Sequence, residues 1–306
     1  MSHPVTFQSK GIIIAANLFI PSKTTEQDRK GAAIIVSHPF GGVKEQTAGL
    51  YAKLLAEAGF ITLAFDAAYQ GESGWEPRYL EDPYQRVEDI KSAVTFLTTR
   101  DEVDLNRIGA LGICASGGYV PFAAATDRRT RAVATISAAD TGRLFREGLG
   151  GGQSRANLLK ALEQAGMERT LKAMGQKPHL EHIVPNTTEE VPTGTPTLYK
   201  EGTNYYRTPR AAHPNSVNWY ISRSIDALAT YSSYSFVDLI SPHPLLMIAG
   251  SGADTFYFSK DAFDAAKEPK ELFVVKGKTH IDLYDDTQET LPRLVEFMKE
   301  YLVEKN

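Results

Sequence analysis

The sequence has 306 residues, of which 33 are basic and 37 acidic, so its formal net charge is −4 and its pI is near 6.0. This charge balance excludes binding to nucleic acid or to an anionic membrane through a broad basic surface. A composition of 42% hydrophobic and 23% charged residues is that of a globular chain. No apolar run approaches the roughly 20 residues that span a bilayer.

The first part of the chain predicts strands that alternate with helices. Residues 4–10 and 12–20 are rich in β-branched and bulky side chains and predict two strands that turn at Lys10-Gly11. A continuous apolar run, as found in strands buried on both faces, follows at 32–36, and further buried strands are predicted at 61–65, 107–113 and 132–138. Apolar residues at helical spacing lie between them, at 46–58, 84–99 and 117–125. This alternation predicts an α/β fold with a mostly parallel sheet and helices on both faces.

The alternation stops in the middle of the chain. Residues 141–236 contain helical pieces such as 156–173 and a loop rich in Pro, Thr and Gly, but no convincing buried strand. The pattern resumes with expected strands and helices at 245–249, 259–266, 272–275 and 290–303. We therefore predict a core formed by residues 1–140 and 237–306, with residues 141–236 inserted as a cap.

One junction between a buried strand and a helix has the residues of a nucleophile elbow. In this sharp turn a nucleophile is exposed above the sheet, and the positions two before and two after it must be small. Cys114 fits, with Gly112 before it and Ser116 after it, and Ser116 also fits, with Cys114 before it and Gly118 after it. We favour Cys114, because choosing Ser116 would place Tyr119 in the crowded turn. Ser116 stays as the alternative.

With this elbow in a strand–helix alternation, the chain resembles the α/β-hydrolase superfamily, and within it the members with a cysteine nucleophile, such as dienelactone hydrolases. The resemblance covers the whole core, whereas the cap is divergent. It implies the chain order nucleophile, acid, histidine. Asp254 follows the expected strand 245–249, and His280 follows 272–275. The resemblance thus implies that His280 deprotonates Cys114 and that Asp254 orients the imidazole. The helix N-terminus beside Cys114 predicts a lowered thiol pKa.

The same resemblance implies an oxyanion hole. Its donors would be the backbone N–H of Ala115, directly after the nucleophile, and that of Phe40 in the loop after the first buried strand. Aromatic residues are candidates for the wall of a substrate pocket, with ordinary packing as the alternative for each: Tyr69, Trp219 and Tyr220.

These features predict a hydrolase that cleaves a carboxylic ester, thioester or lactone through an acyl-cysteine, without a metal or an organic cofactor. His179 and His182 lack the spacing of a zinc site on a helix. Two alternatives stay open, namely acyl transfer to an amine, alcohol or thiol, and a non-catalytic binding protein with a hydrolase fold. The expected partner is a small acyl substrate, with no nucleic acid and no membrane, and a homo-oligomer is left open. The single cysteine and the absence of a secretory signal predict a cytoplasmic protein.

Overall fold

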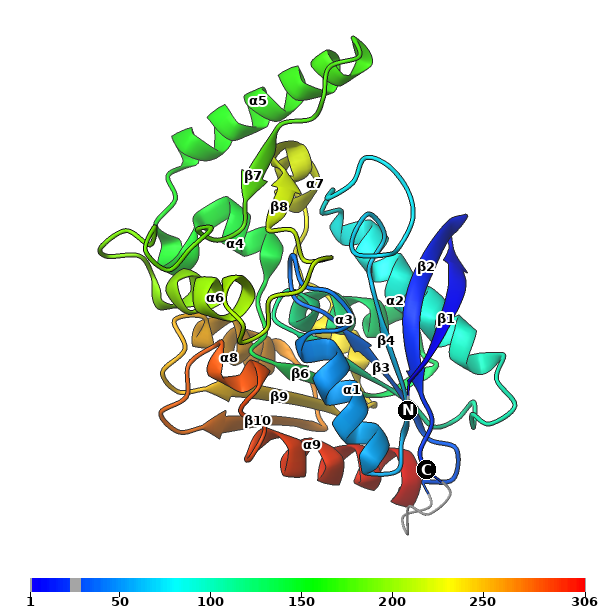
Figure 1. The fold of residues 1–306 in the computed structure, drawn as a ribbon. Coiled ribbons are helices and arrows are strands. Elements are labelled where there is room, and N and C mark those ends of the chain that lie inside the picture. Colours follow the sequence, from blue (N-terminus) through cyan, green and yellow to red (C-terminus); the bar gives the residue numbers. More distant parts are fainter. Residues whose placement is uncertain (1, 23–28, 306) are drawn as a thin grey trace.

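The computed structural model describes residues 2–22 and 29–305 (Figure 1). Within them, eight strands form one sheet in the order β1-β2-β4-β3-β5-β6-β9-β10. β1 pairs antiparallel with β2 and β2 with β4, and all other neighbours are parallel. The predicted, mostly parallel sheet is therefore confirmed. The strands are β1 (Ser2–Ser9), β2 (Ile12–Phe19), β3 (Ala33–Ser37), β4 (Ile61–Phe65), β5 (Ile108–Ile113), β6 (Thr130–Ile136), β9 (Leu245–Gly250) and β10 (Lys270–Val275).

Helices cover both faces of this sheet (Figure 1). One face packs against α1 (Thr47–Glu57) and α9 (Thr290–Lys299), which continues into the π-helical turn η5 (Glu300–Glu304). The other face packs against α2 (Pro83–Thr98), α3 (Ser116–Thr126) and α8 (Phe256–Ala265). The two faces therefore carry two separate hydrophobic cores.

Strand β3 shows why its sequence is continuously apolar. Ala33 and Ile35 belong to the core beneath α2 and α3, whereas Ile34 and Val36 belong to the core beneath α1 and α9. All four are fully buried. Because successive side chains of a strand point to opposite faces, a strand covered on both sides needs apolar residues at every position.

Residues 141–236, which we call the cap, add no strand to the main sheet within the described chain. Its helices are α4 (Thr141–Glu147), η1 (Leu149–Gly151), α5 (Arg155–Ala173), α6 (Thr197–Arg207), η2 (Ser222–Ser224) and α7 (Ile225–Leu228), and η3 (Val237–Ile240) follows it. Two strands, β7 (Leu180–His182) and β8 (Trp219–Ile221), pair antiparallel with each other. The sequence does not predict them, because each has three residues and no buried apolar run. In Figure 1 the cap lies above the core.

No helix in the described ranges combines the length with the apolar character that a bilayer span requires.

Candidate active site

The chain bends sharply at Cys114, between β5 and α3. Cys114 has a φ of 55°, a left-handed value that strains a residue other than glycine by about 1–3 kcal/mol. Its N–H donates to the carbonyl of Ile136 at 3.0 Å, and its carbonyl accepts from the N–H groups of Gly117 and Ala139 at 2.8 and 3.0 Å. Hydrogen bonds from the neighbouring strand and the following helix thus hold the strained turn in place.

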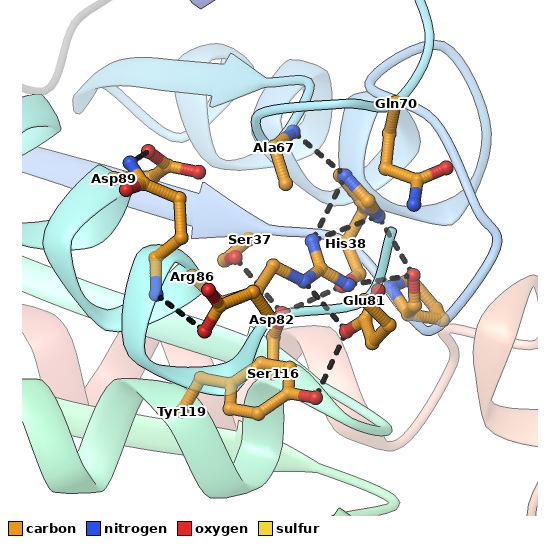
Figure 2. Close-up of polar contacts among 12 residues, drawn as sticks. Ser37, His38, Ala67, Gln70, Glu81, Asp82, Arg86, Asp89, Ser116 and Tyr119 are labelled. Carbon is orange, nitrogen blue, oxygen red and sulfur yellow. Dashed lines mark hydrogen bonds and ion pairs between the residues drawn. The ribbon is translucent and has the colours of Figure 1, made fainter. Parts of the chain in front are cut away.

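The surroundings of the bend distinguish the two possible nucleophiles, Cys114 and Ser116. A Cβ atom on Gly112 would overlap the carbonyl oxygen of Ser116, so only glycine fits there. The Ser116 side chain is fully buried, donates to the carbonyl of His38 at 2.6 Å and shares a hydrogen bond of 2.9 Å with Ser37 (Figure 2). Ser116 therefore faces the core, whereas Cys114 lines a cavity.

This cavity has a volume of about 510 Å³ and lies between the bend and the cap. The core contributes Phe40, Cys114, Ala115, Ile281 and Tyr284 to its wall. The cap contributes mainly apolar and aromatic side chains, among them Leu144, Phe145, Ala165, Ile183, Val184, Leu198, Tyr199, Tyr206 and Tyr220. The volume lies within the range of about 300–1,000 Å³ that is typical of small-molecule sites.

Two backbone amides converge on the sulfur of Cys114. The N–H groups of Phe40 and Ala115 and the side chain of Tyr284 all lie near the thiol and favour its ionised form. Burial raises the pKa of Cys114 above its ordinary value, and these three groups offset only part of that rise. The expected lowering of the thiol pKa is therefore wrong, because loss of solvent outweighs the donors around the sulfur.

The loop that carries Phe40 begins at His38, a buried histidine with three hydrogen-bond partners. Its Nε2 accepts from the N–H of Ala67 and from Nη1 of Arg86, each at 3.0 Å, and its Nδ1 donates to the carbonyl of Pro39 at 2.7 Å (Figure 2). Burial, followed by the charge of Arg86, lowers the pKa of His38 well below its usual value. A neutral ring with one donor and one acceptor nitrogen matches this set of contacts.

Arg86 connects this loop to a buried carboxylate. Its Nε donates to Glu81 at 3.0 Å, and its Nη2 donates to the carbonyl of Pro39 at 3.2 Å. Glu81 also accepts from the hydroxyl of Tyr119 at 2.8 Å, and all three side chains are buried (Figure 2). This buried ion pair and its additional hydrogen bonds hold the loop residues that precede Phe40 in place.

His280 is buried, and each ring nitrogen has one hydroxyl partner. Nδ1 lies 2.6 Å from Oγ1 of Thr255, and Nε2 lies 3.3 Å from the hydroxyl of Tyr284. Its carbonyl accepts from Ser137 at 2.8 Å. Burial lowers the pKa of His280 to about 3, so the ring is neutral near pH 7. Among the described hydrogen bonds, none joins His280 directly to Cys114.

Asp254 lies in the loop after β9, as the chain order implies, but its hydrogen bond goes to the cap. Oδ2 accepts from the N–H of Leu198 in the first turn of α6 at 2.9 Å. Oδ1 is buried and has no hydrogen-bond partner among the described residues. The group at His280 Nδ1 is instead the neighbouring Thr255. Sequence reasoning missed Thr255 and Tyr284, because chain order points to a carboxylate and gives no signal for a hydroxyl.

The three aromatic candidates for the pocket wall have different positions. Tyr220 lines the cavity, with its ring 5.4 Å from that of Phe40 in a T-shaped contact. Trp219 is not among the described lining residues and stacks on His182 at 3.7 Å. Adjacent strand residues point to opposite faces, so only one of the pair in β8 can face the cavity. Tyr69 is also outside this lining, in a loop where its N–H bonds to Gly74.

A second polar cluster surrounds the buried ammonium group of Lys44. Its Nζ lies 2.6 Å from Glu45, 2.9 Å from Asp66 and 2.6 Å from Glu72. Burial lowers the pKa of Lys44, but the charge of Asp66 and the contacts with the other two carboxylates outweigh it and raise the pKa overall. These carboxylates are close enough to hold a cation. The ammonium group already occupies the space between them and offsets one of their negative charges.

The parallel sheet, the strained bend and the paired amides define an α/β hydrolase, and comparisons with known proteins agree. Residues 14–139 match the Dienelactone hydrolase family. The uncharacterized protein YcjY of Escherichia coli (strain K12) is 39% identical, with 99% of this chain and 100% of YcjY covered. The chain therefore belongs to the same family as YcjY, and its likeness to dienelactone hydrolases extends over residues 14–139.

Solved structures extend this result. The crystal structure of hypothetical protein PA2218 from Pseudomonas aeruginosa is 38% identical with a TM-score of 0.91, and covers 98% of this chain and 94% of that one. The α/β hydrolase GrgF from Penicillium sp. is 25% identical with a TM-score of 0.82, and covers 99% of both chains. In the sequence comparison the polyketide transferase grgF is 28% identical over 90% of each chain. The predicted α/β-hydrolase fold is thus confirmed, and the relatives support a hydrolase-type enzyme.

Proposed function

We propose that the protein cleaves a carboxylic ester, thioester or lactone through an acyl thioester on Cys114. The observation that carries this proposal is the position of the Cys114 sulfur. The sulfur is held at a strained bend, lines the cavity and lies beside the backbone amides of Phe40 and Ala115. The match of residues 14–139 to the Dienelactone hydrolase family supports the same reaction class.

In the first half-reaction the sulfur attacks the substrate carbonyl carbon while the thiol proton passes to His280. The carbonyl oxygen becomes an oxyanion and takes the hydrogen bonds of Phe40 and Ala115. Collapse of this intermediate expels the leaving group, which takes the proton from His280. Water then attacks the thioester by the same route and releases the acid. Because burial favours the neutral thiol, the proton leaves as the carbon–sulfur bond forms and not beforehand.

We propose that Asp254 stabilises the imidazolium that forms when His280 takes the proton. A buried Oδ1 without a donor is poised for a new positive charge nearby. Thr255 holds the ring orientation through Nδ1 at 2.6 Å. Asp254 thus acts by charge, while the neighbouring hydroxyl sets the ring position.

The lining of the cavity supports an apolar acyl group. Cap side chains such as Leu144, Phe145 and Val184 line the same cavity as Cys114, and Tyr220 packs on Phe40. Each methylene group of the acyl chain that is buried in this cavity contributes about 0.8 kcal/mol to substrate binding. A free thiol as nucleophile needs a reducing compartment, so we propose the cytoplasm as its location.

Acyl transfer is a second candidate, favoured by the relative named polyketide transferase. A thioester intermediate reacts readily with amines, so an acceptor that enters the cavity in place of water would receive the acyl group. Product analysis in the presence of amine, alcohol and thiol acceptors distinguishes the two reactions. Free acid with every acceptor supports hydrolysis, and an acylated acceptor supports transfer.

Two alanine variants test the nucleophile with activated esters and thioesters. Cys114→Ala is expected to lower kcat by roughly 10³-fold or more, because no acyl-enzyme forms. Ser116→Ala removes the buried hydrogen bonds to the His38 carbonyl and to Ser37 and is expected to keep acyl-enzyme formation. Turnover by Cys114→Ala at the rate of the natural sequence would contradict the proposal, and loss of acylation only in Ser116→Ala would assign the nucleophile to Ser116.

A further inference from the structure

The hydroxyl of Tyr284 lies between the two groups that the proposed reaction must connect. It is 3.3 Å from Nε2 of His280, and it is close enough to the sulfur of Cys114 for each group to shift the pKa of the other. Tyr284 is fully buried and forms part of the cavity wall. Since no described hydrogen bond joins His280 to Cys114, the continuous path between them runs through this hydroxyl.

The fold holds the Tyr284 ring in one place. Tyr284 ends the short helix η4 (Asp282–Tyr284), four residues after His280, so one turn of the chain carries both groups. Its carbonyl accepts from Oγ1 of Thr47 at 2.8 Å, and its ring meets that of Tyr205 edge to face at 5.1 Å. A phenol fixed on both its backbone and its ring is pre-organised for transfer, because little reorganisation precedes the reaction.

We propose that the Tyr284 hydroxyl relays the proton from the Cys114 thiol to Nε2 of His280 during acylation, a step that rests on the proposed function. In the reactive arrangement the phenol donates its one O–H to Nε2 of His280, and its oxygen accepts the S–H of Cys114. As the sulfur bonds to the carbonyl carbon, the S–H proton moves to the phenol oxygen. The O–H proton of the phenol moves to Nε2 in the same step. The products are the oxyanion, the imidazolium and a neutral Tyr284. The leaving group later takes its proton back along the same path.

Three features of the site suit a relay. The pKa of Tyr284 is raised well above its usual value, first by burial, so the phenol stays protonated and always has a proton to pass on. The neutral imidazole of His280 has a free lone pair on Nε2 when Nδ1 carries the hydrogen toward Thr255. The short path avoids a fully separated thiolate in a buried site, where charge is costly.

The test is Tyr284→Phe, which keeps the ring and removes only the hydroxyl. We expect the single-turnover acylation rate with an activated ester to fall by about 10²-fold or more, with little change in KM. Tyr205→Phe is the matched control, since it removes a hydroxyl from the adjacent buried ring that does not line the cavity. Its acylation rate is expected to stay within about threefold of the natural sequence, below any general-acid–base effect.

A proton inventory provides the readout that a structural role would not move. Acylation rates in H₂O–D₂O mixtures should curve for the natural sequence and for Tyr205→Phe, because two protons move together. Tyr284→Phe should give a linear dependence. A linear inventory in the natural sequence, or a Tyr284→Phe variant that acylates at the natural rate, would overturn the relay. If Tyr284→Phe fails to fold by near-UV circular dichroism, the inventory of the natural sequence decides alone.

The relay and the proposed function fail in different ways. If the natural sequence forms an acyl adduct on Cys114 and His280→Gln does not, the proposed function stands. A Tyr284→Phe variant that then acylates at the natural rate rejects only the relay. If no acyl adduct forms on Cys114 in any of these proteins, the proposed function fails, and the relay fails with it.

Discussion

The buried ion pair beneath the loop of Phe40 gives the sharpest prediction about stability. Arg86→Met removes the guanidinium that bonds to Glu81 at 3.0 Å and to the Pro39 carbonyl at 3.2 Å. Glu81 is 1% exposed and would keep only the hydroxyl of Tyr119. Removing one partner of a buried pair leaves an uncompensated charge and costs about 3–5 kcal/mol. We expect a loss of that size in the free energy of unfolding.

Urea unfolding at neutral pH measures this loss, and a double variant isolates its cause. In Glu81→Gln/Arg86→Met the buried charge is gone and a neutral amide can still accept from Tyr119. The double variant should therefore regain at least about 1 kcal/mol relative to Arg86→Met. If Arg86→Met unfolds within about 1 kcal/mol of the natural sequence, or if the double variant is less stable than the single one, the reasoning about the uncompensated charge is refuted.

Three further predictions concern the thiol, the bend and the imidazole. Because burial raises the Cys114 pKa, alkylation by iodoacetamide should have a pH midpoint at or above the free-cysteine value of about 8.5; a midpoint below it would contradict the buried thiol. Gly112→Ala should lower the free energy of thermal unfolding by about 1–3 kcal/mol or more, because its Cβ overlaps the Ser116 carbonyl. In the control Gly166→Ala the Cβ meets open space, and the free energy of unfolding should rise by roughly 0.5–1 kcal/mol. Equal effects of the two substitutions would refute the steric argument. His280 has a pKa of about 3 when folded and 6.5 when unfolded, so the unfolded state binds the proton more readily and stability falls as pH drops below 6.5. At pH 4 this loss of stability amounts to about 3 kcal/mol. Between pH 7 and pH 4, the free energy of unfolding measured in urea should therefore fall by about 3 kcal/mol less for His280→Gln than for the natural sequence. Equal losses in the two proteins would contradict the lowered pKa of His280.

Much of the fold could be predicted because burial on both faces leaves a plain signal. The strands β3 to β6 are mostly apolar and almost entirely buried, and the helices α1 and α2 between them carry apolar residues at helical spacing. The pair β7 and β8 gave no such signal, because the strands are short and not fully buried. Once β8 is known, the two-residue period explains why Tyr220 faces the cavity and Trp219 does not.

The candidate site could be predicted only as far as backbone geometry reaches. The small residues beside Cys114 indicate the bend, and the chain order places Asp254 and His280 in the loops after β9 and β10. Which side chain meets which nitrogen depends on rotamers and on packing against the cap. Thus the hydroxyl of Thr255 lies on His280 Nδ1, while Asp254 bonds to α6. Tyr284 reaches the sulfur through tertiary packing that no local pattern indicates.

The intact mass of the protein after a brief exposure to activated esters and thioesters tests whether Cys114 forms an acyl-enzyme. We expect an increase equal to one acyl group, mapped to the peptide that contains Cys114 and released by hydroxylamine. The same increase is expected in Ser116→Ala and none in Cys114→Ala. An acyl group mapped to another residue, or turnover of these substrates by Cys114→Ala at the natural rate, would contradict a covalent route through this sulfur.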